Sequence, residues 1–143
     1  GYKLTDDIGY EAVLHACHVA KKYDTKIALT FSDKFIIDLF KERLMEIASL
    51  SDLIFCNETE GMAFTKTNSS EKALKSLEKS YKNIAFTKSE NGSIISWEGE
   101  QYEIPAYKAK PVDSTGAGDM YAGGLFFGLI YGESIEKAGN LAS

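Results

Sequence analysis

The segment from Asp113 to Asp119 reads Asp-Ser-Thr-Gly-Ala-Gly-Asp and places small, flexible residues directly before a carboxylate. Residues 120–131, which follow, are apolar nearly throughout and predict a helix whose first turn is formed by 116–119. The backbone N–H groups of a first helical turn have no helical partner and lie at the positive end of the helix dipole. Because Gly116 and Gly118 have no side chain that would block these amides, the turn predicts a phosphate-binding site.

Asp119 adds a proton acceptor to this predicted phosphate site. A general base beside a bound phosphate is what an enzyme needs to transfer a phosphoryl group to a hydroxyl. The same residues have a purely structural explanation, since glycine-rich turns between strands and helices are common and an Asp in a first turn stabilises the helix dipole. Spacing alone leaves both interpretations open.

A second polar motif, Asn57 and Glu60, follows the apolar segment 53–56. An amide and a carboxylate at the start of a helix offer oxygen ligands that suit Mg²⁺, directly or through its water shell. The alternative is a capping box, in which Asn57 caps the helix and Glu60 is the reciprocal partner. On these residues alone, capping is the better explanation.

The elements that must position these motifs alternate between helix and strand. Helices are predicted from Asp6 or Asp7 to about Tyr23, at 33–48, at 58–64, at 70–81 with Ser70 as the cap, and from 135 onward. Strands are predicted at 26–31, which reads as buried, and at 53–56 and 83–87, while 93–97 and 101–104 predict a hairpin. The alternation predicts an α/β fold with a mostly parallel sheet, helices on both faces and an antiparallel hairpin added late.

The heptad 113–119 and the apolar, glycine-bearing helix after it closely resemble the C-terminal signature of the ribokinase-like carbohydrate kinases, the phosphofructokinase-B (PfkB) family. Asn57 and Glu60 resemble the Asn-x-x-Glu motif of that family, which is associated with magnesium and phosphate handling, so beside Asp119 the functional interpretation becomes the favoured one. Residues 1–33 resemble the middle of an adenosine-kinase-like sugar kinase. The resemblance covers nearly the whole chain and implies a ribokinase-like three-layer α/β/α fold.

The segment 87–92 resembles a Thr-x-Gly-x-x-Gly turn that lies against the nucleotide in this family. It follows a predicted strand, and ligands of open α/β sheets bind at the carboxyl ends of strands. Thr87 and Gly92 match the pattern, whereas Ser89 stands where a glycine is usual and puts a side chain where backbone normally approaches the ligand. Ser89 either donates its hydroxyl to a phosphate or narrows the pocket. The structural alternative is a simple loop that leads into the hairpin.

Asp113 follows Pro111 and Val112 at the end of a predicted extended segment. By resemblance to ribokinase-type members, Asp113 helps to bind a monovalent cation such as K⁺ near the anion turn. The alternative is that its side chain closes the loop through an Asx-type hydrogen bond. The two interpretations are equally favoured.

Composition narrows the class of protein. The 143 residues are 44% hydrophobic, enough for one ordinary domain core, and the net charge of -5 without a Lys/Arg cluster argues against a nucleic-acid partner. No apolar run is long enough to span a bilayer and no signal peptide is recognisable, so we expect a cytoplasmic protein without a membrane partner. His15 and His18 are expected to face solvent, Cys17 to be a buried small hydrophobe, and Cys56 to belong to the strand before Asn57.

The resemblance implies that residues 1–143 form the nucleotide-binding and catalytic portion of a kinase that uses ATP and Mg²⁺. Asp119 is then the base, the amides of Gly116, Ala117, Gly118 and Asp119 stabilise the transferring phosphoryl group, and a sugar or a nucleoside is the acceptor. A vitamin kinase of pyrimidine type is the alternative within this fold. A non-catalytic nucleotide- or phosphate-binding module is the alternative from another class.

The N-terminal half of the family, with its glycine-rich sugar-recognition segment and the strands of its lid, has no counterpart in these residues. We therefore expect the chain to be an internal or C-terminal portion of a longer kinase. The segment alone is expected to be inactive, and a homodimer of the full-length protein is left open.

Overall fold

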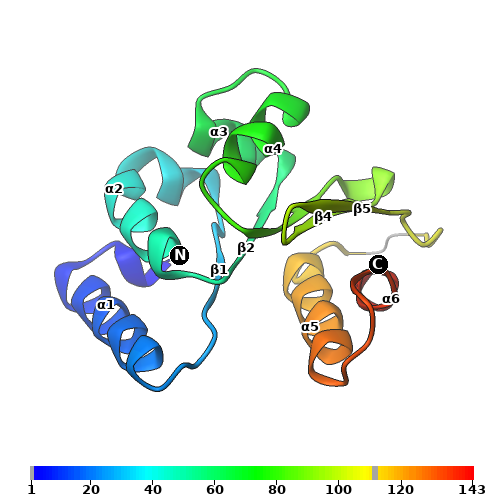
Figure 1. Cartoon of the computed structure of the whole chain (residues 1–143). Helices are drawn as coiled ribbons and strands as arrows, with labels where there is room; N and C mark the ends of the chain where they lie inside the picture. Colours follow the sequence, from blue (N-terminus) through cyan, green and yellow to red (C-terminus); the bar gives the residue numbers. More distant parts are fainter. Residues whose placement is uncertain (1, 111–112) are drawn as a thin grey trace.

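A computed structural model of the chain describes residues 2–110 and 113–143 (Figure 1). Its helices are α1 (Asp7–Lys22), α2 (Lys34–Leu50), α3 (Glu58–Thr65), α4 (Ser70–Glu78), α5 (Ala117–Ile130) and α6 (Ile135–Ala142), with short 3₁₀ turns η1 (Tyr2–Leu4) and η2 (Ser89–Asn91). Its strands are β1 (Ala28–Thr30), β2 (Leu53–Asn57), β3 (Asn83–Thr87), β4 (Ser93–Trp97) and β5 (Glu100–Ile104).

The five strands form one mixed sheet in the order β1-β2-β3-β4-β5. β1, β2 and β3 pair in parallel, whereas β4 pairs antiparallel with both β3 and β5. The predicted hairpin is confirmed, and its two-residue turn is made by Glu98 and Gly99 at φ of 53° and 93°. Positive φ at both positions matches the twist of the two strands that the turn joins.

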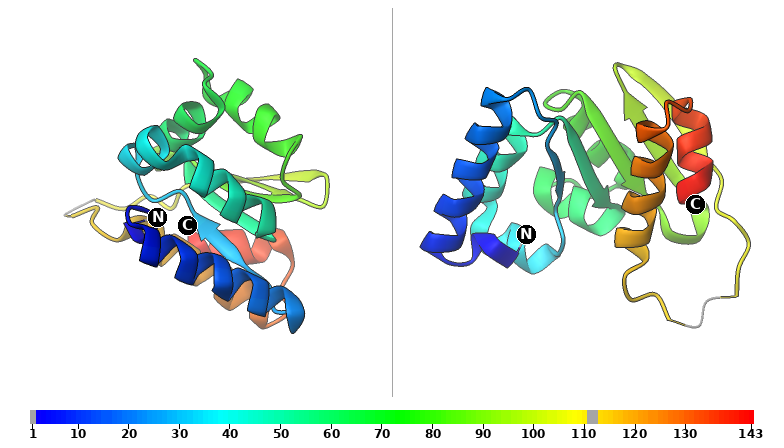
Figure 2. Two further views of the ribbon diagram at one scale, coloured as in Figure 1. Left: turned by 90° about the vertical axis from the view of Figure 1, so that its left-hand side faces the viewer. Right: turned by 90° about the horizontal axis from the view of Figure 1, so that it is seen from below.

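The helices lie in two layers, one on each face of the sheet (Figures 1 and 2). One hydrophobic cluster joins α1, α2, α3 and α4 to one face through residues such as Ile54 and Phe86. A second cluster joins α5 and α6 to the opposite face through Phe55, Ile95 and Leu125. The alternation of side chains along β2 sends Ile54 to one cluster and Phe55 to the other. The predicted α/β fold with helices on both faces is confirmed.

Side-chain caps fix where most helices begin. Asp6, one of the two predicted caps of α1, accepts from the amide of Gly9 at 2.7 Å, and Asp33, expected to be the first residue of α2, caps it by accepting from the amide of Phe35 at 2.7 Å. The predicted cap of α4 is wrong by one residue, because Ser69 rather than Ser70 accepts from the amide of Lys72, at 3.3 Å. An Asp or Ser at this position satisfies an amide that has no helical partner.

The segment 26–31 was expected to be a buried strand, and this expectation is wrong. Only Ala28–Thr30 form β1, and Ala28 and Thr30 are exposed. The physical reason is position, since β1 is an edge strand and the cluster beneath α5 and α6 contains no residue of β1. The flanking Phe31 is fully buried in the other cluster.

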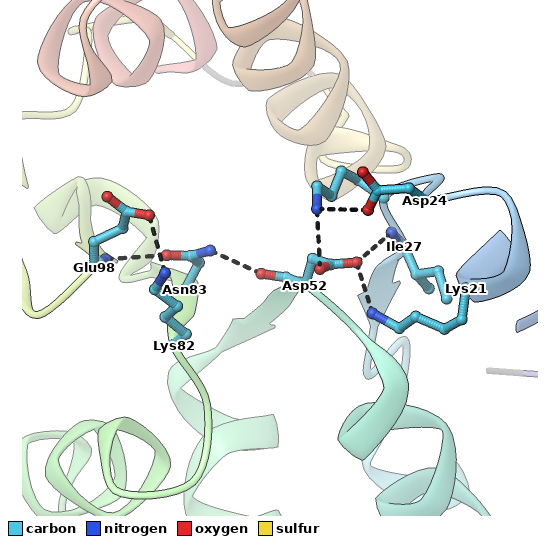
Figure 3. A network of polar contacts seen from close by, with 8 residues as sticks. Lys21, Asp24, Ile27, Asp52, Lys82, Asn83 and Glu98 are labelled. Carbon is cyan, nitrogen blue, oxygen red and sulfur yellow. Dashed lines mark hydrogen bonds and ion pairs between the residues drawn. The ribbon is translucent and has the colours of Figure 1, made fainter.

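A polar network fastens the amino ends of the first three strands (Figure 3). The Asp52 carboxylate accepts from the amide of Ile27 at 2.9 Å and from Lys21 Nζ at 3.1 Å. The Asn83 side chain donates to the Asp52 carbonyl at 2.9 Å and accepts from the amide of Glu98 at 3.0 Å. These bonds connect β1, β2, β3 and the hairpin at the amino ends of the parallel strands. The carboxyl ends of these strands lie at the opposite end of the sheet.

Among residues 2–110 and 113–143, no helix has the length and apolar character needed to cross a membrane. His15 and His18 are exposed, while Cys17 and Cys56 are only 5% and 4% exposed. These exposures confirm the placement predicted for His15, His18 and Cys17, and Cys56 lies in β2 as expected.

Candidate active site

The carboxyl ends of β1, β2 and β3 and the N-terminus of α5 surround a hollow of about 460 Å³. The predicted site residues Asn57, Glu60, Thr87 and 116–119 all line it. The parallel strands have their carboxyl ends at the same end of the sheet. The first turn of α5 reaches this end from the helix layer that contains α5 and α6. Residues that are distant in the sequence therefore form one concave site.

The N-terminus of α5 is open. Gly116 is the cap residue with a φ of 79°, and no side chain among the described residues makes a capping hydrogen bond there. The carbonyl of Gly116 accepts from the amide of Met120 at 2.9 Å, so the helix begins as predicted. The amide of Ala117 is not available to a ligand in this conformation, because it donates to the Ser114 carbonyl at 3.1 Å. The amides of Gly118 and Asp119 are left at the positive end of the dipole.

Asp119 lies in this first turn, is exposed and lines the hollow. Its carboxylate and the open amides belong to the same turn. A phosphate bound at the amides would therefore lie close to a proton acceptor, which is the arrangement that general-base catalysis needs.

Asp113 lies outside the set of residues that line the hollow. Its Oδ1 accepts from the amide of Thr115 at 2.8 Å, so the Asx-type turn predicted as one alternative is confirmed. The hydrogen bonds from Thr115 lower the pKa of the Asp113 carboxyl. The extended conformation expected at Pro111 and Val112 lies outside the described residues. Binding of a monovalent cation stays a prediction.

Asn57 and Glu60 form a capping box at the start of α3. Asn57 Oδ1 accepts from the amide of Glu60 at 2.9 Å, and Glu60 Oε2 accepts from the amide of Asn57 at 3.1 Å. A third bond runs from Asn57 Nδ2 to Glu60 Oε1 at 2.9 Å. The capping interpretation is thereby confirmed, and the magnesium role stays a prediction.

Each Glu60 oxygen accepts one hydrogen bond and keeps a lone pair that a cation or its water shell can use. The Glu60 side chain is 8% exposed, and burial raises the pKa of its carboxyl, with a further contribution from the negative charge of Asp33. Both causes disfavour a lone negative charge at this place. A cation would relieve both, so the donor set is compatible with Mg²⁺ although no group of three His, Cys, Asp or Glu is assembled within 2–110 and 113–143.

The loop that follows β3 places its predicted residues differently. Thr87 lines the hollow, whereas Ser89 and Gly92 do not. Ser89 adopts a left-handed conformation with a φ of 51°, which is consistent with a glycine being usual there. Gly92 is buried at a φ of 81°, and a Cβ there would lie 2.0 Å from the Ile104 carbonyl oxygen. Packing alone thus requires glycine at position 92, and the nucleotide contacts of this loop stay a prediction.

Two residues at the end of β1, Thr30 and Ser32, also line the hollow and were not among the predicted site residues. Ser32 has a φ of 69°, and its amide donates to Thr30 Oγ1 at 3.2 Å. The signal in the sequence is the presence of polar residues at the carboxyl end of a predicted strand, the criterion that also points to Asn57 and Thr87.

The fold and the site agree with comparisons to known proteins. The chain is 29% identical to the adenosine kinase of Saccharomyces cerevisiae over 151 aligned residues, covering 96% of this chain and 44% of that protein. It is 30% identical to the cytidine kinase of Thermococcus kodakarensis, covering 78% of this chain and 42% of the relative. The crystal structure of adenosine kinase from Sinorhizobium meliloti matches with a TM-score of 0.88 and 31% identity over 94% of this chain and 42% of that one.

The chain thus spans less than half the length of each of these relatives. Residues 4–143, which include the whole sheet and every residue that lines the hollow except Tyr2, match the family model described as pfkB family carbohydrate kinase. The partial ribokinase-like fold and the adenosine-kinase-like character are confirmed. The chain belongs to the pfkB family of carbohydrate kinases.

Proposed function

We propose that the full-length protein is an ATP-dependent kinase that transfers the γ-phosphoryl group to a hydroxyl of a sugar or a nucleoside. The observation that carries this proposal is the open N-terminus of α5, which shares one turn and one hollow with the exposed carboxylate of Asp119. Relatives named as adenosine kinase, cytidine kinase and deoxyribokinase support an acceptor of this class.

In the proposed step, the Asp119 carboxylate accepts the proton of the acceptor hydroxyl. The acceptor oxygen forms a bond to the γ-phosphorus, the bond from that phosphorus to the bridging oxygen breaks, and ADP leaves with the electron pair. The amides of Gly118 and Asp119 stabilise the charge on the transferring group, since they are fixed in the helix before the reaction begins. Asp119 has to be exposed for this role, because the acceptor must reach it.

Mg²⁺, when bound, neutralises charge on the phosphates. Glu60, with Asn57, is the group that would hold it, directly or through water. Thr87, and the loop to Gly92, would line the nucleotide, and Asp113 is proposed to help hold K⁺. The remaining length of the relatives is expected to supply the residues that bind the acceptor, so residues 1–143 alone are expected to be inactive.

The test measures acceptor-dependent release of ADP from ATP and Mg²⁺ by the full-length protein, against pentoses, hexoses, nucleosides and pyrimidine-type vitamin precursors. Turnover with a sugar or a nucleoside is the expected result. Turnover with a vitamin precursor alone would move the proposal to another acceptor class. ATP binding without turnover on any acceptor would indicate a non-catalytic module. Turnover by residues 1–143 alone would contradict the proposed division of the site.

A further inference from the structure

Tyr121 lies two residues after Asp119 and connects the first part of α5 to the sheet. Its side chain is 9% exposed, and its hydroxyl lies 2.7 Å from Ser93 Oγ, whose residue is 3% exposed. Burial raises the pKa of Tyr121, so the phenol stays neutral and the contact is a hydrogen bond between two hydroxyls. It lies within the otherwise apolar contact between α5 and the sheet.

Ser93 is held in place by strand pairing on both sides. It is the first residue of β4, where it pairs with Thr87 on β3 and with Ile104 on β5. Gly92, the residue before it, packs directly against the Ile104 carbonyl. The hydrogen bond from Tyr121 therefore ends at the base of the loop that follows Thr87, on the other side of the proposed site.

The first turn of α5 has little packing of its own. Residues 113–120 are exposed, Met120 by 76%, whereas Leu125, one turn after Tyr121, is fully buried against the sheet. Apolar packing therefore orients α5 beyond its first turn. Gly124 and Gly128 fit closely against α6 and fix the later turns. The Tyr121 to Ser93 bond supplies a directional contact at the beginning of α5.

Two apolar residues of the same shape could fill this space without the cost of burying two hydroxyls. We propose, on the basis of the function proposed above, that Tyr121 is a positioning residue. Through Ser93 it holds the first turn of α5 so that Asp119 and the open amides face the nucleotide side of the hollow. Loosening of this first turn would let the Asp119 carboxylate turn away from that direction.

The experiment uses the full-length protein with Tyr121→Phe, Ser93→Ala and the double variant. Tyr102→Phe is the matched control, because its hydroxyl also makes one side-chain hydrogen bond, to Glu100 at 2.9 Å, while its ring packs against the same cluster. We expect Tyr121→Phe to lower kcat about tenfold, since small misplacement of a reacting group costs up to about 10²-fold. The KM for ATP should change less than kcat, because the nucleotide contacts proposed for Thr87 and, through Mg²⁺, for Glu60 remain. The double variant should lose no more than Tyr121→Phe alone, which identifies one shared interaction.

Hydrogen exchange gives a readout that does not depend on activity. The amides of Ala117 and Met120, which donate to the carbonyls of Ser114 and Gly116, should exchange faster in Tyr121→Phe and Ser93→Ala than in the wild type or in Tyr102→Phe. If Tyr121→Phe and Ser93→Ala keep kcat within about twofold while Asp119→Asn loses activity, the inference is wrong and the proposed function stands. An equal loss in Tyr102→Phe would also overturn it, since any weakened packing would then suffice. If Asp119→Asn keeps its activity, the proposed function and this inference both fall.

Discussion

Two helices, α3 and α5, point their N-termini at the same hollow but satisfy their first amides differently. At α3 the side chain of Asn57 and the carboxylate of Glu60 accept each other's backbone amides. At α5 no described side chain caps the helix, and Gly116 takes the cap position. The first amides of α3 are therefore satisfied within the protein, whereas the positive end of the α5 dipole remains available to a ligand.

The carboxylates at the two helix starts, Glu60 at α3 and Asp119 at α5, also differ in how accessible they are. Glu60 is buried and holds hydrogen bonds from Asn57, whereas Asp119 is exposed. A buried, bonded carboxylate is fixed in place and suits a cation site. An exposed one can meet an incoming hydroxyl. This difference is consistent with the proposed proton transfer at α5 and the proposed cation binding at α3, and the following predictions test that division.

The largest effect is expected for Asp119→Asn in the full-length protein. It keeps the shape of the side chain and removes the base, and loss of general-base catalysis typically costs about 10²–10⁴ in rate. Glu58→Gln is the matched control, because Glu58 is a carboxylate in the first turn of α3 that does not line the hollow. Steady-state kinetics with the best acceptor measure both. Near-normal kcat in Asp119→Asn would show that another group takes the proton.

The next effect is expected from closing the open turn with Gly116→Asp. A carboxylate beside the amides of α5 competes with and repels the phosphate, and loss of one such donor typically costs about 10²–10³ in kcat. Gly116→Ala is the control, since it also replaces the glycine at a φ of 79°, adds no charge, and places a Cβ where no atom lies within 4 Å. The expected result is a lower kcat/KM for ATP in Gly116→Asp than in Gly116→Ala. Equal values would mean that the amides do not hold the phosphate.

Periodicity and caps predicted most of the fold. The strand 83–87 and the two strands of the hairpin have the predicted positions to within one residue, because turn residues bound each of them and Glu98 and Gly99 separate the two hairpin strands. The strand 26–31 had the same local signal, but its burial depends on which helices cover it, and that is not encoded locally. The cap of α4 was misplaced because Ser69 and Ser70 are equivalent in the sequence.

The site was predictable where a residue type carries its own chemistry. Spacing made Gly116, Gly118 and Asp119 candidates and the resemblance to the carbohydrate kinases favoured their functional interpretation, and the structure places them together with Asn57, Glu60 and Thr87. The hydrogen bond between Tyr121 and Ser93 could not be predicted, because an aromatic residue in an apolar helix gives no sign of its partner on a distant strand. Long-range polar pairs of this kind depend on register, which only the assembled sheet sets.

A smaller effect is expected for Asn57→Ala, which removes the cap of α3. Loss of an N-cap costs about 0.5–2 kcal/mol of stability. Ser69→Ala, which removes the cap of α4, should cost a similar amount. If Asn57 and Glu60 also organise Mg²⁺, only Asn57→Ala should raise the magnesium concentration needed for half-maximal rate. One thermal melt and one magnesium titration of each variant separate the roles, and an unchanged titration would leave Asn57 with capping alone.

The smallest effect is expected in the pH dependence of stability, where Glu60→Gln is compared with the wild type without magnesium. Burial raises the pKa of Glu60 above its ordinary value of 4.5, and the charge of Asp33 adds to the shift. The folded protein therefore binds this proton more tightly than the unfolded chain, so stability falls as the pH rises from about 4.5 through the folded pKa. Gln stays neutral, so Glu60→Gln should gain stability relative to the wild type across that window and keep a constant difference above it.

Urea unfolding of the full-length protein at closely spaced pH values measures this difference in stability. Repeating the measurement with Mg²⁺ should reduce the difference, because a bound cation stabilises the charged carboxylate. A difference that does not vary with pH would mean that Glu60 has the same pKa in both states, and one that magnesium leaves unchanged would argue against a cation site at α3.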